Sequence, residues 1–275
     1  MYSKVYVEIT NLCNMRCSFC HGHKRSPRQM TREEFSAVLQ QLQGHTRYIY
    51  YHLMGEPLTH PLLPEFLDMA EKQGFRSVLT TNGTLLDSRG QALIDARVHK
   101  VNISVHSFEQ GGDAAFCAYL SKVADFAQQA SVQGILVSLR LWNKGCDHGR
   151  NEKILAFFRE RWQEDWQPNS RGYRIQDKLY LEWGDRFQWP DKNAPLRQDV
   201  VTCRGLEDHF GILCDGTVVP CCLDSEGEIA LGNIFREDIG QILSSQRAKA
   251  MVQGFACRTP TEELCHRCQY ASRFR

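Results

Sequence analysis

The chain has 275 residues, of which 42% are hydrophobic, and its formal net charge is +1. This length suits one large domain or a domain with a small appendage, and enough apolar residues are present for a sizeable core. The balanced charge lacks the basic excess that is typical of nucleic-acid-binding proteins, so no nucleic-acid partner is predicted.

No run of about 18 apolar residues occurs, which predicts that no helix crosses a membrane. The first residues, "MYSKVYVEITN", lack the apolar core and cleavage site of a signal peptide, so a cytoplasmic location is expected. In a reducing compartment, twelve cysteines favour metal or redox chemistry over a disulfide framework. Some of them are expected to be small buried packing residues.

Strand and helix patterns alternate from residue 4 to about residue 185. The second pattern, "TREEFSAVLQQLQ", begins with a capping box formed by Thr31 and Glu34. In chain order the predicted strands are 4–10, 48–53, 77–83, 100–107, 135–142 and 178–184, and the predicted helices are 31–43, 61–73, 87–96, 113–133 and 151–163.

This alternation predicts an α/β fold with a parallel sheet and outer helices. Six units are too few to close an eight-stranded barrel, so a partial (β/α)6 TIM-type barrel is expected, with its chemistry at the C-terminal ends of the strands. Residues 162–195 hold four of the five tryptophans. They are interpreted as a last strand in an irregular connector, which either caps the barrel near substrate or packs through its aromatic rings.

The pattern changes at about residue 200. "FGILCDGTVVPCC" (210–222) predicts a hairpin with its turn at Asp215–Gly216, and a helix is expected around 238–252. Seven cysteines lie beyond residue 200. We therefore divide the chain into a barrel domain (1–195) and a small cysteine-rich domain (196–275).

Three cysteines lie close together in "CNMRCSFC", directly after the first predicted strand: Cys13, Cys17 and Cys20. Cysteine thiolates are the usual ligands of iron–sulfur clusters. Three ligands leave one iron of a [4Fe–4S] cluster open to bind a reactant, although half of a zinc site is an alternative. The basic loop that follows (21–30) either meets an anionic substrate or is solvated.

The spacing Cys-x3-Cys-x2-Cys with Phe19 before the last cysteine, followed by "MGEP" at 54–57, resembles the radical S-adenosylmethionine (SAM) superfamily. The resemblance implies that Cys13, Cys17 and Cys20 hold a [4Fe–4S] cluster whose fourth iron binds SAM. Reductive cleavage of SAM would yield a 5′-deoxyadenosyl radical, with a flavodoxin or ferredoxin as electron donor.

The same resemblance places further residues at SAM. Those implied are Gly55, Glu56 and Pro57 at its amino group, Ser104 at the ribose, Arg140 at the carboxylate and the backbone of Phe19 near the adenine. For Ser104 and Arg140 an ordinary structural role is an equal alternative.

The C-terminal cysteines are similar to the auxiliary-cluster domain of this superfamily, of the SPASM or short "twitch" type. The layout resembles that of aminocyclitol dehydrogenases and of peptide-modifying relatives. It implies a second [4Fe–4S] cluster, with a zinc site as the alternative. A further cluster that uses Cys214, Cys222 and Cys257 also stays open. The implied ligands of the second cluster are Cys203, Cys221, Cys265 and Cys268.

The expected function is removal of a hydrogen atom from an unactivated carbon of a peptide or a small, sugar-like substrate, with the auxiliary cluster assisting oxidation. One alternative is a radical peptide epimerase in which Cys222 donates hydrogen; another is a non-catalytic iron–sulfur or zinc protein. No general base stands out, and His106, Glu182 and Asp185 are candidates by position only.

Overall fold

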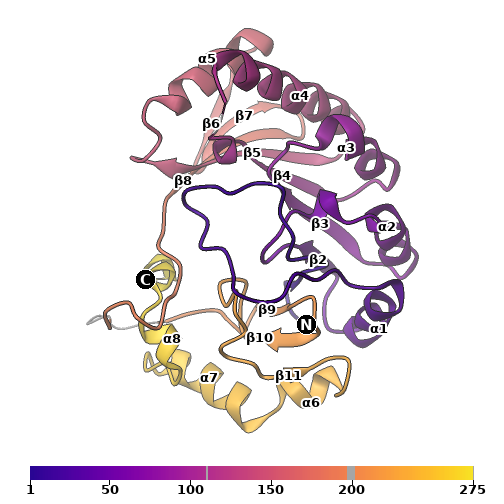
Figure 1. Cartoon of the computed structure of the whole chain (residues 1–275), viewed down its shortest axis with the longest axis vertical. Coiled ribbons are helices and arrows are strands. Elements are labelled where there is room, and N and C mark those ends of the chain that lie inside the picture. The colour runs from indigo at the N-terminus through magenta and orange to yellow at the C-terminus, as the bar shows by residue number, and fades with distance from the viewer. Residues whose placement is uncertain (110, 197–201, 275) are drawn as a thin grey trace.

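The structure is a computed structural model that describes residues 1–109, 111–196 and 202–274. Eleven strands among these residues form one sheet in the order β11-β10-β9-β1-β2-β3-β4-β5-β8-β7-β6. Its central part is parallel, and Figure 1 shows it as an arc. The central strands are β1 (Lys4–Val7), β2 (Tyr48–Tyr51), β3 (Arg76–Thr81), β4 (Lys100–Ser104), β5 (Leu136–Lys144) and β8 (Leu179–Asp185).

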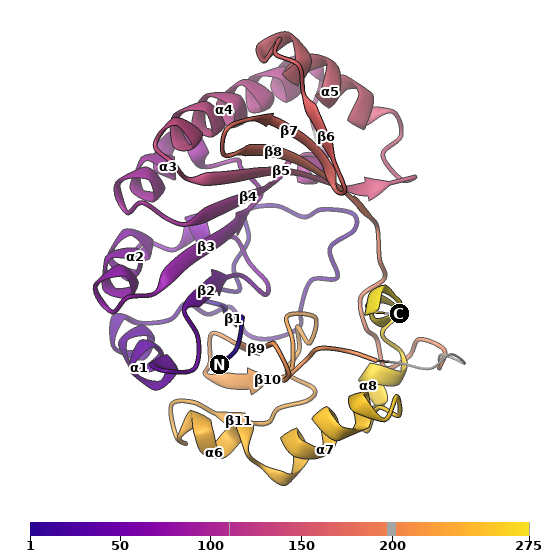
Figure 2. The same ribbon diagram turned by 180° about the vertical axis from the view of Figure 1, so that it is seen from behind.

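Helices cover the convex side of this arc, as both Figure 1 and Figure 2 show. The Thr31–Glu34 capping box is present at the start of the first, as predicted. The predicted α/β class and partial (β/α)6 barrel are confirmed, and the arc stays open on one side. The helices are α1 (Arg32–Leu42), α2 (Leu63–Lys72), α3 (Leu86–Asp95), α4 (Asp113–Val132) and α5 (Arg150–Arg161).

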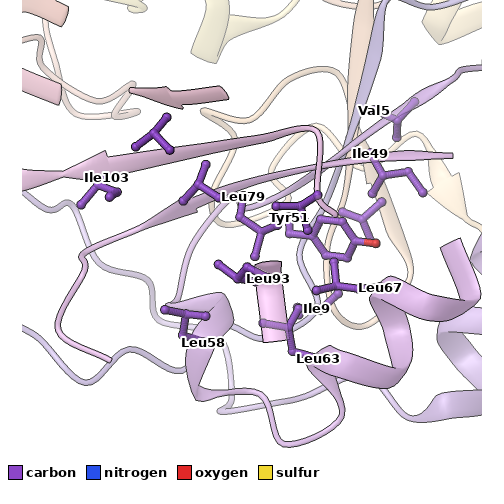
Figure 3. Packing of buried hydrophobic residues seen from close by; sticks show 14 of the residues in the cluster. Val5, Ile9, Ile49, Tyr51, Leu58, Leu63, Leu67, Leu79, Leu93 and Ile103 are labelled. Atoms are coloured by element: carbon purple, nitrogen blue, oxygen red, sulfur yellow. The ribbon is translucent and has the colours of Figure 1, made fainter. Parts of the chain in front are cut away.

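Side chains of the central strands alternate between two environments, because successive residues of a strand point to opposite faces. Apolar residues such as Val5, Ile49 and Leu79 are buried against the helices and form the core shown in Figure 3. The intervening positions carry polar groups, among them Tyr50 and Lys100. The concave side of the arc, which we call the lumen, is therefore polar.

The C-terminal hairpin consists of β9 (His209–Ile212) and β10 (Thr217–Val219), which confirms the predicted hairpin. The place of this hairpin was not predicted. Strand β9 pairs with β1 in parallel, so the barrel sheet continues into the cysteine-rich part. The last strand on that side is β11 (Gly232–Asn233), which pairs with β10. The division at residues 195–196 stays a prediction. It borders residues 197–201, which lie outside the described ones.

Two local predictions were wrong. Residues before β8 form an antiparallel hairpin, β6 (Gln167–Asn169) and β7 (Gly172–Gln176), where an irregular connector was expected. The single helix expected around 238–252 is two, α6 (Ile239–Leu243) and α7 (Gln246–Ala256). The chain breaks there because Ser245 caps α7 by accepting a hydrogen bond from the backbone of Ala248.

Short helical turns complete the described chain. None of the helices in its described ranges has the length and apolar character needed to cross a membrane. The remaining elements are the helix α8 (Glu263–His266) and the 3₁₀ helices η1 (Pro57–Thr59), η2 (Val105–Ser107) and η3 (Gln269–Phe274).

Candidate functional site

Residues 12–22, which we call the cysteine loop, follow β1 and are tied to the C-terminal ends of the neighbouring strands. Beyond β2, the backbone N–H of Glu56 donates to the carbonyl of Leu12 (2.8 Å). Beyond β3, the side chain of Asn82 donates to Asn14 (2.9 Å). These bonds place the loop at the end of the barrel where chemistry is expected.

A third tie comes from beyond β4 and was missed in the sequence. The carboxylate of Glu109 accepts hydrogen bonds from both the backbone N–H (2.5 Å) and the hydroxyl (2.6 Å) of Ser18. The Cys17 thiol donates to the carbonyl of Ser107 (3.5 Å). No sequence motif marked Glu109, because only the fold brings it to a loop about 90 residues away.

The three thiols of the loop suit an iron–sulfur cluster. Backbone N–H groups of Met15 and Gly22 donate to the sulfurs of Cys13 (3.5 Å) and Cys20 (3.4 Å), and such bonds tune iron–sulfur clusters. Burial, together with the other thiols, raises the pKa of Cys17 to about 12. A thiol in this environment needs the charge of a metal to become a thiolate ligand.

The described residues contain no group of three or more His, Cys, Asp or Glu side chains placed to hold one metal ion. A cubane cluster needs no such convergence, because each thiolate binds its own iron. None of the twelve cysteines, all of which lie in the described ranges, forms a disulfide. The donor set of the cysteine loop therefore fits a [4Fe–4S] cluster with one iron left open.

The Gly-Glu-Pro motif packs directly beneath the cysteine loop. Gly55 has φ of +77°, and a side chain there would place its Cβ 2.3 Å from the carbonyl oxygen of Thr10. Only glycine permits both this backbone conformation and this close approach. Pro57 follows as the first residue of η1.

Glu56 is only 2% exposed, and its carboxylate is held by backbone groups. One oxygen accepts from the N–H of Asn82 (2.7 Å) and the other from the N–H of Leu58 (3.0 Å). Burial raises the pKa of Glu56 to about 7 despite these bonds. The carboxylate thus fixes the ends of β2 and β3 relative to each other.

The other predicted SAM residues gather at the same end of the barrel. Ser104 and Arg140 are partners in the β4–β5 ladder. The ring of Phe19 lies 4.9 Å from the ring of His106, and His106 Nδ1 is 2.9 Å from the carbonyl oxygen of Arg140. The roles of Phe19, Ser104 and Arg140 toward SAM stay predictions, but the structure brings them together around His106, which was a candidate base.

Arg140 and Glu182 form part of a charged network in the lumen. Arg140 Nε lies 3.7 Å from a Glu182 oxygen, and Lys100 Nζ lies 3.4 Å from the other. Burial acts to raise the pKa of Glu182, but the two cations outweigh it and the pKa is lowered. Glu182 is therefore ionised and a weak proton acceptor. Asp185, at the end of β8, is exposed.

The second set of cysteines lines a cavity of about 150 Å³. Lys4, the first residue of β1, also lines it, so the cavity lies at the opposite end of β1 from the cysteine loop. The backbone N–H of Gly205 donates to the Cys203 sulfur (3.3 Å). Four thiols around one cavity fit a second, fully ligated cluster. The four are Cys203, Cys221, Cys265 and Cys268.

The three remaining C-terminal cysteines lie in different environments. Cys222 lines the same cavity and hydrogen-bonds the hydroxyl of Tyr6, which lies on β1. Burial raises the pKa of Cys222, which keeps it a thiol. Cys214 is buried beside Arg25 (3.7 Å), and Cys257 is exposed.

A buried ion pair joins the barrel to the C-terminal part and was not predicted. Glu8 is fully buried, and its two oxygens accept from the guanidinium of Arg25 (both 2.7 Å) and from the backbone of Met54 and Cys214. Arg25 also donates to the carbonyl of Ser225 (2.7 Å). The basic loop 21–30 is thus partly structural, and we call this pair the Glu8–Arg25 clamp.

Comparisons with known proteins agree with this geometry. Residues 7–126 match the radical SAM superfamily, and residues 203–269 match an iron–sulfur cluster-binding (SPASM) domain. A GTP 3′,8-cyclase of Microcystis aeruginosa is 22% identical over 90% of this chain and 89% of its own. Several other GTP 3′,8-cyclases match over less than half of their own length.

Two solved structures share the fold. BtrN in complex with AdoMet and 2-DOIA has a TM-score of 0.64 at 17% identity, covering 98% of this chain and 93% of its own. Native anSMEcpe with bound AdoMet and Cp18Cys peptide has a TM-score of 0.63 at 14% identity, covering 97% of this chain and 86% of its own.

Proposed function

Because the chain belongs to the radical SAM superfamily and carries a SPASM domain, we propose that it removes a hydrogen atom from an unactivated carbon of a peptide or small polar substrate and completes an oxidation. It binds [4Fe–4S] clusters and SAM and performs SAM-dependent radical chemistry. Bound together, SAM and the first cluster supply a carbon-centred radical. An electron carrier such as a flavodoxin or ferredoxin is the proposed reductant.

The observation that carries the proposal is the position of the two cysteine sets at opposite ends of β1, with the polar lumen between them. A substrate in the lumen lies between the radical source and a second redox centre. Loss of a hydrogen atom, then of a proton and one electron, is a two-electron oxidation, and the second centre suits acceptance of that electron.

The relatives leave the substrate class broad. By their names and titles they act on GTP or hold 2-DOIA or a peptide. In this chain, Cys13, Cys17 and Cys20 are the proposed ligands of the first cluster, and the four cavity cysteines are those of the second. Ser104 and Arg140 are proposed to bind SAM.

The test is anaerobic reconstitution, reduction and addition of SAM, with 5′-deoxyadenosine measured by mass spectrometry. The wild type should form it and hold about eight irons per chain. Replacing Cys13, Cys17 and Cys20 by alanine should abolish it, whereas the exposed Cys117 and Cys146 serve as matched control positions. Product formed by the triple variant at the wild-type rate would contradict the proposal.

Peptide epimerisation is a second candidate, favoured by one contact. The Cys222 thiol faces Tyr6 in the barrel, so it borders the lumen and can return a hydrogen atom to a substrate radical. Turnover of a candidate peptide in heavy water should then incorporate deuterium, and Cys222→Ala should prevent this while Cys257→Ala does not. Unchanged incorporation in Cys222→Ala would exclude this role.

A further inference from the structure

The lumen holds a connected cluster of polar side chains, of which the function proposed above uses only Arg140. Tyr6 on β1 and Tyr50 on β2 pack edge to face, with ring centroids 5.4 Å apart. His52, just beyond β2, lies 5.2 Å from Tyr6. The ammonium of Lys4 lies 5.7 Å from the ring centre of Tyr6 and 5.8 Å from that of Tyr50. We call these four residues, with Lys100, Arg140 and Glu182, the lumen cluster.

Cations outnumber carboxylates in this cluster. Lys4, Lys100 and Arg140 carry positive charge, and Glu182 is the one carboxylate among its members. Lys4 forms no ion pair with any carboxylate in the described part of the chain, although it is half-buried. Glu8, a buried carboxylate just beyond β1, is neutralised by the Glu8–Arg25 clamp. The ammonium of Lys4 is stabilised by the faces of the Tyr6 and Tyr50 rings and not by a carboxylate, which leaves its N–H donors open to an anionic ligand.

Two buried nitrogen atoms of the cluster also have no hydrogen-bond partner within the described residues: His52 Nδ1 and Arg140 Nε. Burial, with the nearby charges of Arg140 and Lys4, lowers the pKa of His52 to about 3, so the ring is neutral. Buried polar atoms are normally satisfied. The open N–H of Arg140 and the ammonium of Lys4 both act on His52, and together these cationic donors indicate a place prepared for a polar, negatively charged group.

We propose that the lumen cluster binds an anionic group of the substrate, a carboxylate or a phosphate, and that Lys4 is its direct ligand. The inference rests on the proposed function in placing the substrate in the lumen, and it narrows the substrate class to anionic molecules. Lys4 also lines the cavity of the second cysteine set. An anion at Lys4 therefore anchors the substrate at the end of the lumen remote from the cysteine loop.

The experiment measures anion binding to the reconstituted holoprotein by isothermal titration calorimetry. Sodium tripolyphosphate and sodium citrate are the two probes, and they distinguish phosphate from carboxylate recognition. The wild type should bind at least one of them. Lys4→Met keeps the length of the side chain and should weaken that binding about tenfold to hundredfold, the range expected for one lost hydrogen bond between charged groups. Lys4→Arg should retain binding.

Lys72→Met is the matched control, because Lys72 pairs with Asp68 on the exposed face of α2. It should bind the probe as the wild type does. A second measurement needs no variant: saturating probe should slow alkylation of Cys222, which shares the cavity with Lys4, but not of the exposed Cys257.

Absence of binding by both probes, equal binding by Lys4→Met, or unprotected Cys222 would overturn the inference. SAM binding titrated on the same samples separates it from the proposed function. Wild-type protein that binds SAM but neither anion refutes the anionic substrate alone, whereas protein that binds an anion but not SAM refutes the radical function alone.

Discussion

At the scale of single residues, Gly55 shows why the Gly-Glu-Pro motif tolerates no side chain at its first position. The residue combines a left-handed backbone with a carbonyl oxygen 2.3 Å from where a Cβ would lie. The matched control is Gly74, which has φ of +83° and nothing within 4 Å. Comparison of the two separates backbone strain from steric exclusion.

Gly55→Ala is expected to lower the free energy of unfolding by at least about 3 kcal/mol, because strain and overlap add. Gly74→Ala should lower it by about 1 kcal/mol, because it introduces strain alone. Denaturant unfolding measures both, and iron analysis should show less bound iron in Gly55→Ala only. Equal destabilisation by the two variants would refute the steric argument.

Glu56 predicts a pH dependence of stability. Its pKa is about 7 in the folded chain, above the ordinary value of 4.5. Between these values the folded state binds more protons than the unfolded state, so the free energy of unfolding falls as pH rises. Protonation of Glu56 in the folded state stabilises the protein by about 2–4 kcal/mol. This stabilisation is fully present below about pH 4.5 and is lost by about pH 7.

Glu56→Gln cannot ionise and should lack this decline. The measurement is the difference in free energy of unfolding between the wild type and the variant from pH 4.5 to 7.5, in cluster-free, reduced protein. A difference that stays constant over this pH range would show that burial does not raise the pKa of Glu56.

At the scale of elements, the Glu8–Arg25 clamp joins the extension of β1 to the hairpin β9–β10 and to the loop after the cysteines. Removing one partner of a buried ion pair leaves the other uncompensated, which costs about 3–5 kcal/mol. Glu8→Gln should therefore lower the free energy of unfolding by about 3 kcal/mol or more in a denaturant titration.

The control for the clamp is the exposed pair of Asp68 and Lys72, whose side chains are 53% and 73% exposed. Asp68→Asn should change stability by no more than about 0.5 kcal/mol. If Glu8→Gln were as mild as Asp68→Asn, the clamp would not hold these elements together.

Local patterns predicted elements well where one local interaction dominates. The Thr31–Glu34 box starts α1, and positive φ at Gly216 allows the predicted hairpin turn. The β6–β7 hairpin was missed because Pro168 and polar residues obscure the strand pattern. Its register is set by pairing with β8, a tertiary interaction that propensity cannot show.

At the scale of the whole molecule, the cysteine-rich part is built into the barrel sheet. β1 lies between β2 and β9, so removal of β9 would expose an apolar edge strand at the start of the barrel. A chain that ends at Pro195 is therefore expected to aggregate or to lose cooperative unfolding. Size-exclusion chromatography and thermal circular dichroism measure this, and a monomeric fragment with a sharp transition would contradict it.

The Cys-x3-Cys-x2-Cys spacing and Gly-Glu-Pro predicted SAM-dependent radical chemistry because each motif is contiguous in sequence. Glu8, Arg25 and Glu109 were not predicted as supports of the site, since each acts on a partner that only the fold brings near. The one visible signal was an acidic residue in the apolar run "VYVEIT". A charge there suggests a buried partner, but the sequence cannot say which cation supplies it.

The pairing of β1 with β9 has a consequence for how the protein is made. About 200 residues separate these strands, so at 5–20 residues per second β9 leaves the ribosome roughly 10–40 s after β1. The groups of Cys214 and Ser225 that complete the Glu8–Arg25 clamp emerge later still. During synthesis the Glu8–Arg25 clamp, which adjoins the cysteine loop, therefore stays incomplete until the far end of the chain has been made.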